Sequence, residues 1–211
     1  MNERTRAGFL AFVAARHGHF RLESGHHSRL WLDLDALFAE PRRIVPFVAA
    51  LADAIRPHDV TAVCGPLQGG AFLAQLIAHA LEVEFWFTER VAPVDSGKLY
   101  GARYRLPLAF MARARDSRVA MVDDVMSAGS ALRGTYAELR IHGSVPIVAG
   151  ALLVLGSAGT AFFNEQGVAV EAVCREPYDL WLPSDCPLCS AGVPLEDAAE
   201  IAQDDAAAAS P

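Results

Sequence analysis

The stretch RVAMVDDVMSAGSAL, residues 118–132, is the part of the chain that decides the fold. Its first apolar run, residues 119–122, has the length of a buried strand. Two carboxylates, Asp123 and Asp124, follow, and the small residues 127–130 (SAGS) allow a tight turn before a helix with regularly spaced apolar residues. A strand, a turn and a helix in this order direct backbone N–H groups at an anion, and the carboxylates stand where they accept hydrogen bonds from sugar hydroxyls.

Three interpretations of this stretch compete. The first is an ordinary strand-to-helix turn with two solvated aspartates. The second is a phospho-receiver domain, but there the acidic pair comes early and a lysine follows it, whereas the only lysine here, Lys98, lies upstream. The third is the ribose-5-phosphate site of type I phosphoribosyltransferases, whose signature the stretch closely resembles: an apolar run, two acids, two variable residues and then Ser/Thr-Ala-Gly-Ser/Thr.

Composition limits the class of protein. The chain has 211 residues, enough for one domain with a full hydrophobic core. Its net charge of −7 argues against general nucleic-acid binding, which needs a basic surface. No apolar run reaches the roughly 18 residues of a membrane span, and the N-terminus lacks a signal-peptide pattern. We therefore expect a cytoplasmic protein that acts on small molecules and has neither nucleic-acid nor membrane partners.

A second glycine loop follows another apolar strand. Residues 60–64 have the pattern of a short strand, GPLQGG follows at 65–70, and residues 71–81 have the pattern of a helix. Gly69 and Gly70 would allow the backbone to approach an anion closely, although glycines that open a helix also serve packing. The loop gains weight because it repeats the arrangement of the first stretch.

The polar stretch 91–101 predicts a long loop, since it contains glycine and proline and lacks apolar spacing. Cationic residues gather in and around it: Arg90, Lys98, Arg103 and Arg105. One interpretation is a solvated hairpin. The other is a mobile lid that closes over a charged leaving group and excludes water.

The alternation of strands and helices predicts the α/β class, a mainly parallel sheet flanked by helices on both faces. Both glycine loops follow the carboxyl ends of strands, where such sheets bind ligands. We expect a helix over residues 2–17 and a turn at 156–159. A single domain over residues 1–199 is expected, followed by a disordered Ala/Asp-rich tail at 200–211.

The four cysteines include one Cys-x-x-Cys pair, Cys186 and Cys189. A structural zinc site needs four ligands, and neither a second such pair nor a histidine pair lies nearby in the sequence. The pair would therefore bind zinc only if distant residues or a partner subunit supplied the other ligands. Otherwise the thiols are reduced and serve packing.

Five segments together resemble the orotate phosphoribosyltransferase family over about residues 18–196. They are residues 18–28 (GHFRLESGHHS), 65–70 (GPLQGG), 88–90 (TER), 122–130 (VDDVMSAGS) and 181–195 (WLPSDCPLCSAGVPL). The resemblance implies the type I phosphoribosyltransferase fold, with a small N-terminal hood at about 1–40 and a mobile lid at about 90–102. It also implies a homodimer in which the lid of one subunit reaches the site of its neighbour.

The resemblance implies transfer of a phosphoribosyl group from 5-phosphoribosyl 1-diphosphate to orotate, with Mg²⁺ held mainly by the diphosphate and not by protein ligands. The residues implied in catalysis are Asp123, Asp124, Lys98 and Arg90. Those implied around the 5-phosphate are Val125, Met126, Ser127, Ala128, Gly129 and Ser130. Those implied around the diphosphate are Leu67, Gln68, Gly69, Gly70, Arg103 and Arg105. Those implied around the base are Ser24, Gly25, Ser28 and Arg133.

Some positions depart from the family pattern and leave the acceptor base open. The lid has no histidine, and Glu23 and Gln68 stand where other branches carry lysine. The alternatives are a phosphoribosyltransferase for another base, such as a purine, and a non-catalytic regulator that senses phosphoribosyl diphosphate. An intact acidic pair with a cationic lid favours catalysis, because a sensor has no need to expel water.

Overall fold

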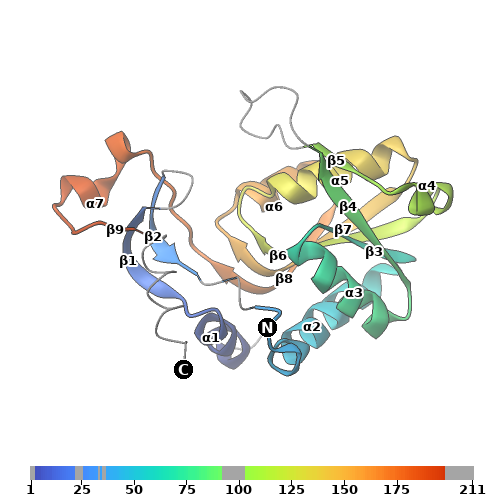
Figure 1. The fold of residues 1–211 in the computed structure, drawn as a ribbon, viewed down its shortest axis with the longest axis horizontal. Helices are drawn as coiled ribbons and strands as arrows, with labels where there is room; N and C mark the ends of the chain where they lie inside the picture. Colours follow the sequence, from blue (N-terminus) through green and yellow to red (C-terminus); the bar gives the residue numbers. More distant parts are fainter. Residues whose placement is uncertain (1–2, 22–25, 33, 35–36, 92–102, 198–211) are drawn as a thin grey trace. The chain divides into compact units, whose positions relative to one another are not determined.

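Six strands form the main sheet of the computed structural model, in the order β5-β4-β3-β6-β7-β8 (Figure 1). The structure describes residues 3–21, 26–32, 34, 37–91 and 103–197. The strands are β3 (Ala62–Pro66), β4 (Glu84–Val91), β5 (Arg103–Arg105), β6 (Arg118–Met126), β7 (Val145–Leu155) and β8 (Ala169–Glu176). All neighbours pair in parallel except β4 and β5, which are antiparallel. The predicted α/β class with a mainly parallel sheet is confirmed.

Helices cover both faces of this sheet. The helices of this part of the chain are α2 (Pro41–Ile55), η1 (Arg56–His58), α3 (Gly69–Leu81), α4 (Leu108–Ala114), α5 (Ser130–Ile141) and α6 (Ala158–Glu165). Figure 1 shows α2 and α3 on one side of the sheet and α5 and α6 on the other. The central strands β6 and β7 are therefore buried on both faces, which explains their nearly continuous apolar runs.

The chain reverses its direction of travel across the sheet between β3 and β6. From β3 the chain passes through α3 to β4 on one side, and from β6 it passes through α5 to β7 on the other. The two strands pair only from Ala62 with Val119 to Cys64 with Met121, so their carboxyl ends separate. A crevice at such a switch point is where open parallel sheets bind ligands.

The chain divides into two units. One contains Met1–Arg6 and Pro41–Glu176, including the six-stranded sheet, and the other contains Ala7–Glu40 and Pro177–Pro211. In the second unit β1 (Arg16–Arg21) pairs with β2 (His27–Trp31) and β9 (Glu196–Asp197). The remaining helices are α1 (Glu3–Phe12), η2 (Pro183–Asp185) and α7 (Pro187–Ser190). The predicted hood at about 1–40 and single domain over 1–199 stay predictions, and the predicted tail at 200–211 lies outside the described residues.

Two expectations for local structure were wrong. The helix expected over residues 2–17 ends at Phe12, because Ala14 takes a left-handed backbone conformation and the residues from Arg16 onward pair with β2. Residues 158–159 of the expected turn belong instead to α6, a helix of eight residues that is too short to show a clear apolar period. Within the described part of the chain, no helix is both long and apolar enough to cross a membrane.

Candidate active site

Asp123 and Asp124 lie near the carboxyl end of β6, at the switch point, and both are half-buried. Asp123 Oδ1 accepts a hydrogen bond of 3.1 Å from the backbone N–H of Asp124. Asp124 Oδ1 accepts one of 2.7 Å from the backbone N–H of Val125. These short-range bonds fix the orientation of both carboxylates.

The pKa values of both carboxyl groups are raised above their ordinary values. Burial and then the neighbouring carboxylate of Asp124 raise the pKa of Asp123 well above its ordinary value. Burial also raises the pKa of Asp124, and the hydrogen bond from Val125 opposes that rise. A site of this kind favours groups that relieve the repulsion, such as sugar hydroxyls that donate hydrogen bonds or a cation.

The glycine loop between β3 and α3 lies beside this pair. A Cβ atom on Gly69 would lie only 2.2 Å from Asp124 Oδ2, and one on Gly70 would lie 2.8 Å from Asp123 Oδ1. The two glycines therefore let the positive N-terminal end of α3 approach the acidic pair, which stabilises negative charge there. In the same loop Leu67 and Gln68 are exposed, and the peptide bond that joins them is cis.

The loop from Ser127 to Gly129 leads from β6 into α5. Gly129 has φ of +74° and occupies the cap position before Ser130, the first residue of the helix. It has no side chain with which to cap the helix, so the N–H groups of the first turn face outward for an anion. The backbone N–H of Gly159, at the start of α6, donates a bond of 3.0 Å to the Ser127 carbonyl and holds the loop in place.

The cationic residues expected near the leaving group fall in two sets. Lys98 lies outside the described residues. Arg90 is exposed near the end of β4, and Arg103 and Arg105 are exposed on β5. Arg105 forms an exposed ion pair of 3.1 Å with Glu89, so its charge is already partly balanced.

A groove of about 530 Å³ lies between β5 and α5. It is lined by Arg103, Tyr104, Arg133, Gly134, Ala137, Glu138 and Ile141. Arg133, predicted to contact the base, donates a bond of 3.1 Å to the Ala158 carbonyl, and its guanidinium lies 4.1 Å from the ring centre of Phe162. These contacts hold the guanidinium plane in a defined orientation.

Of the other residues predicted around the base, Ser24 and Gly25 lie outside the described residues. Ser28 is buried on β2 in the second unit, where its hydroxyl accepts a bond of 3.2 Å from the backbone N–H of Leu30. Ser28 also bonds the hydroxyl of Tyr178. The structure thus brings together the acidic pair and the two glycine loops, all in the first unit. Ser28 belongs to the second unit.

Sequence reasoning missed three contributors to the site. Tyr104 is half-buried, and burial and the Asp123 charge raise the pKa of its phenol while Arg90 lowers it. Thr88 and Thr135 share a buried hydrogen bond of 2.7 Å between their hydroxyls, which joins β4 to the first half of α5. Only the Thr88-Glu89-Arg90 motif hinted at any of them, and no local pattern pairs Thr88 with a residue on a distant helix.

The acidic pair, the two loops and the sheet that holds them define a type I phosphoribosyltransferase. Solved structures support this fold. The crystal structure of orotate phosphoribosyltransferase from Aeropyrum pernix matches with a TM-score of 0.62 at 21% identity, over 80% of this chain and 92% of that one. The adenine phosphoribosyltransferase of Trypanosoma brucei matches with a TM-score of 0.63 at 17% identity, over 83% and 81%.

The chain belongs to the orotate phosphoribosyltransferase family. It is 34% identical over 189 residues to the orotate phosphoribosyltransferase of Carboxydothermus hydrogenoformans, which covers 89% of this chain and 92% of that protein. No profile of a known protein family matches the chain. The predicted resemblance and fold are confirmed.

Proposed function

We propose that the protein transfers the phosphoribosyl group of 5-phosphoribosyl 1-diphosphate to N1 of orotate, giving orotidine 5′-monophosphate and diphosphate. The observation that carries this proposal is the acidic pair of β6, placed at the switch point of the sheet and followed directly by an open helix N-terminus. One motif thus offers acceptors for ribose hydroxyls and donors for a 5-phosphate. Membership of the orotate family supplies the acceptor base.

The reaction breaks the bond between C1 of the ribose and the diphosphate oxygen, and it forms a bond from C1 to N1 of the base. Positive charge develops on the ribose ring in the transition state. Asp123 and Asp124 hold the ring by its hydroxyls and stabilise that charge, and because they are already oriented by backbone N–H groups, little reorganisation is needed. The N–H groups at the start of α5 hold the 5-phosphate and set the position of C1.

We further propose that Mg²⁺ accompanies the diphosphate. The site fits this ion, because carboxylate oxygens are hard ligands and the two raised pKa values mark a place where a cation relieves repulsion. Asp124, beside the start of α3, is the residue we place nearest to the magnesium diphosphate. When bound, the ion would neutralise charge on the leaving group.

A homodimer in the cytoplasm completes the proposal. The exposed Arg90 and Arg103 are cations that the chain presents on β4 and β5, next to the segment 92–102 that would form the lid. A lid that reaches a neighbouring subunit would add Lys98 to these charges. Sedimentation equilibrium at several protein concentrations tests the dimer directly.

The experiment that tests the proposed function measures diphosphate release from phosphoribosyl diphosphate and Mg²⁺ with a panel of bases. Turnover is expected with orotate and not with adenine, hypoxanthine or uracil. Turnover with adenine alone would replace the acceptor, and tight binding of phosphoribosyl diphosphate without turnover of any base would indicate a sensor. Asp124→Asn serves as the inactive control. Arg113→Ala serves as the active control, because it removes only an exposed ion pair between α4 and Glu84.

A further inference from the structure

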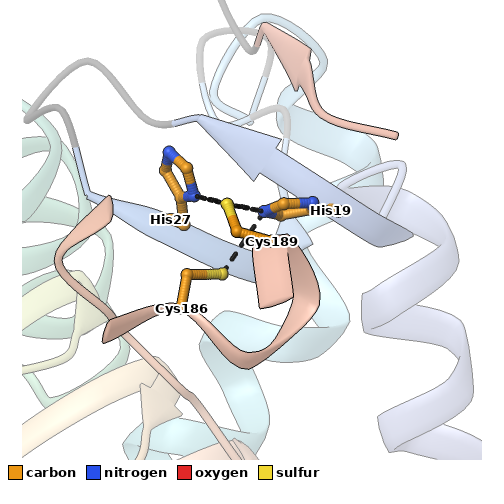
Figure 2. A group of neighbouring side chains, drawn as sticks. All are labelled: His19, His27, Cys186 and Cys189. Carbon is orange, nitrogen blue, oxygen red and sulfur yellow. Dashed lines mark hydrogen bonds between the residues drawn. The ribbon is translucent and has the colours of Figure 1, made fainter. Parts of the chain in front are cut away.

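Four potential metal ligands gather in the second unit, at a point where two strands meet the C-terminal segment. Figure 2 shows His19 and His27 facing Cys186 and Cys189. Their ligand atoms all lie within 4.8 Å of one another. The histidines come from β1 and β2. Cys186 directly precedes α7, and Cys189 lies within it. The two pairs are more than 150 residues apart in the sequence.

The spacing of these atoms fits a tetrahedral ion. His19 Nε2 lies 3.1 Å from His27 Nδ1 and 3.4 Å from Cys186 Sγ. Cys189 Sγ lies 3.7 Å from His19 Nε2 and 3.3 Å from His27 Nδ1. Tetrahedral zinc with bonds of about 2.05 Å to nitrogen and about 2.3 Å to sulfur places neighbouring ligands about 3.3 Å (N to N) and about 3.6 Å (N to S) apart.

The backbone around the histidines is shaped to bring them together. The pairing of β1 with β2 shifts by one residue between His17 and Phe20, so His19 lies within a β-bulge. A bulge redirects a side chain, and bulges recur next to functional sites. Here the bulge belongs to the stretch of backbone from which His19 reaches the same point as His27.

A hydrogen bond to the backbone also sets which ring nitrogen of His19 faces the cluster. Its Nδ1 lies 2.9 Å from the Val193 carbonyl, which can only accept a hydrogen bond, so Nδ1 carries the proton and Nε2 offers its lone pair to the cluster. A ring nitrogen that donates to a backbone carbonyl while the other nitrogen binds metal is the usual second contact of a metal-ligating histidine.

We propose that His19, His27, Cys186 and Cys189 bind one Zn²⁺ ion in a closed structural site. Two imidazoles and two thiolates at tetrahedral spacing form a ligand set typical of zinc. His19, His27 and Cys186 are buried. The two imidazole nitrogens and two sulfurs of the cluster all lie within 4.8 Å of one another, which is the arrangement that one bound ion would hold together. All four coordination positions are filled by protein, so the ion would hold structure and would not bind substrate.

The site has a clear structural task. The sheet of the second unit has three strands, and its third strand, β9, pairs at only two positions. A sheet of this size buries little apolar surface, and small folds are often stabilised by a metal. The proposed zinc would fasten the segment around α7 to the β1–β2 hairpin. Its four ligands belong to the second unit, whereas the acidic pair and the two glycine loops belong to the first.

The first test measures metal on the whole wild-type chain, expressed in zinc-supplemented medium and purified under reducing conditions without chelator. Elemental analysis is expected to find one zinc per chain. X-ray absorption at the zinc edge is expected to show nitrogen at about 2.0–2.1 Å and sulfur at about 2.3 Å. Cobalt(II) chloride added to the reduced apoprotein is expected to give the visible bands of tetrahedral cobalt with thiolate charge transfer. If the purified protein held no zinc and the apoprotein gave no tetrahedral cobalt spectrum, the proposal would be overturned.

The second test compares Cys186→Ser and His27→Gln with Cys64→Ala, which changes a buried cysteine of the main sheet. The first two are expected to lose the bound zinc, whereas Cys64→Ala should keep it. Removal of zinc from the wild type is expected to lower Tm, and addition of zinc sulfate should restore it. If Cys186→Ser and His27→Gln kept as much zinc as Cys64→Ala, the assignment of these ligands would be overturned. If a ligand variant unfolds, the cobalt spectrum of the wild type still tests the site.

Discussion

The carboxylate of Asp124 lies against the α-carbon of Gly69, in the space that a Cβ atom would occupy. This contact joins the end of β6 to the first residue of α3, so the acidic pair and the glycine loop form one unit. The glycines were expected to serve an anionic ligand, and the structure gives them a second task, which is to make room for the enzyme's own carboxylates.

Gly69→Ala should separate activity from stability. The added methyl group must displace the Asp124 carboxylate, and a displacement of about 1 Å at a reacting centre costs about 100-fold in rate. Because the group that must move is a side chain and not backbone, Tm should change little. The measurements are kcat/KM with orotate and thermal unfolding of the same preparation.

Gly65→Ala is the matched comparison. Its Cβ would run into the Gly70 carbonyl, which is backbone and cannot swing away. We expect this variant to lose about 3 kcal/mol of unfolding free energy in a urea titration. If Gly69→Ala lost as much stability as Gly65→Ala, the contact with Asp124 would not be what requires glycine at residue 69.

Asp123→Asn should stabilise the ligand-free protein while lowering kcat by about 100-fold. Burial and the Asp124 charge raise the pKa of Asp123 in the folded state above the ordinary value of about 3.9. The folded state therefore binds more protons than the unfolded state between these two pKa values, and the stability of the wild type falls as the pH rises through that interval.

The difference in Tm between Asp123→Asn and the wild type should consequently be largest near neutral pH and should shrink below about pH 4. Thermal unfolding across this range measures it. A Tm difference that is independent of pH would show that folding does not raise the pKa of the Asp123 carboxyl group.

Thr88 and Thr135 should behave as a coupled pair. Thr88→Val or Thr135→Val alone leaves one buried hydroxyl without its partner, which costs about 1–3 kcal/mol. The double variant removes both hydroxyls and should be more stable than the sum of the single effects predicts. Urea unfolding of the four proteins gives the coupling free energy, and strict additivity would contradict the role of this bond in joining β4 to α5.

Lys98→Ala should lower kcat by about 100-fold with little change in Tm, if the lid neutralises the departing diphosphate. Arg113→Ala is the control, because it also removes one positive charge but lies on α4. The comparison is made at saturating phosphoribosyl diphosphate and Mg²⁺. An unchanged rate would remove Lys98 from the mechanism.

Local sequence was sufficient to predict the elements that carry much of the candidate active site. Residues 118–132 predicted β6, the acidic pair and the start of α5, because strand length, charge and small turn residues are all properties of neighbours in the chain. The same holds for the β3–α3 loop. The predictions for the end of α1 and the start of α6 were wrong, since strand pairing and helix packing depend on partners that a local window does not contain.

The sequence by itself determined the class of chemistry, since one continuous stretch holds both the acidic pair and the loop predicted to bind the 5-phosphate. Only the tertiary structure decided which distant groups meet. It placed Gly69 against Asp124, Thr88 against Thr135, and the Cys186–Cys189 pair against two histidines from a bulged hairpin. The physical reason is that a metal site or a buried hydrogen bond depends on distances of a few ångströms in space, and these are set by sheet register and packing, which spacing along the chain does not encode.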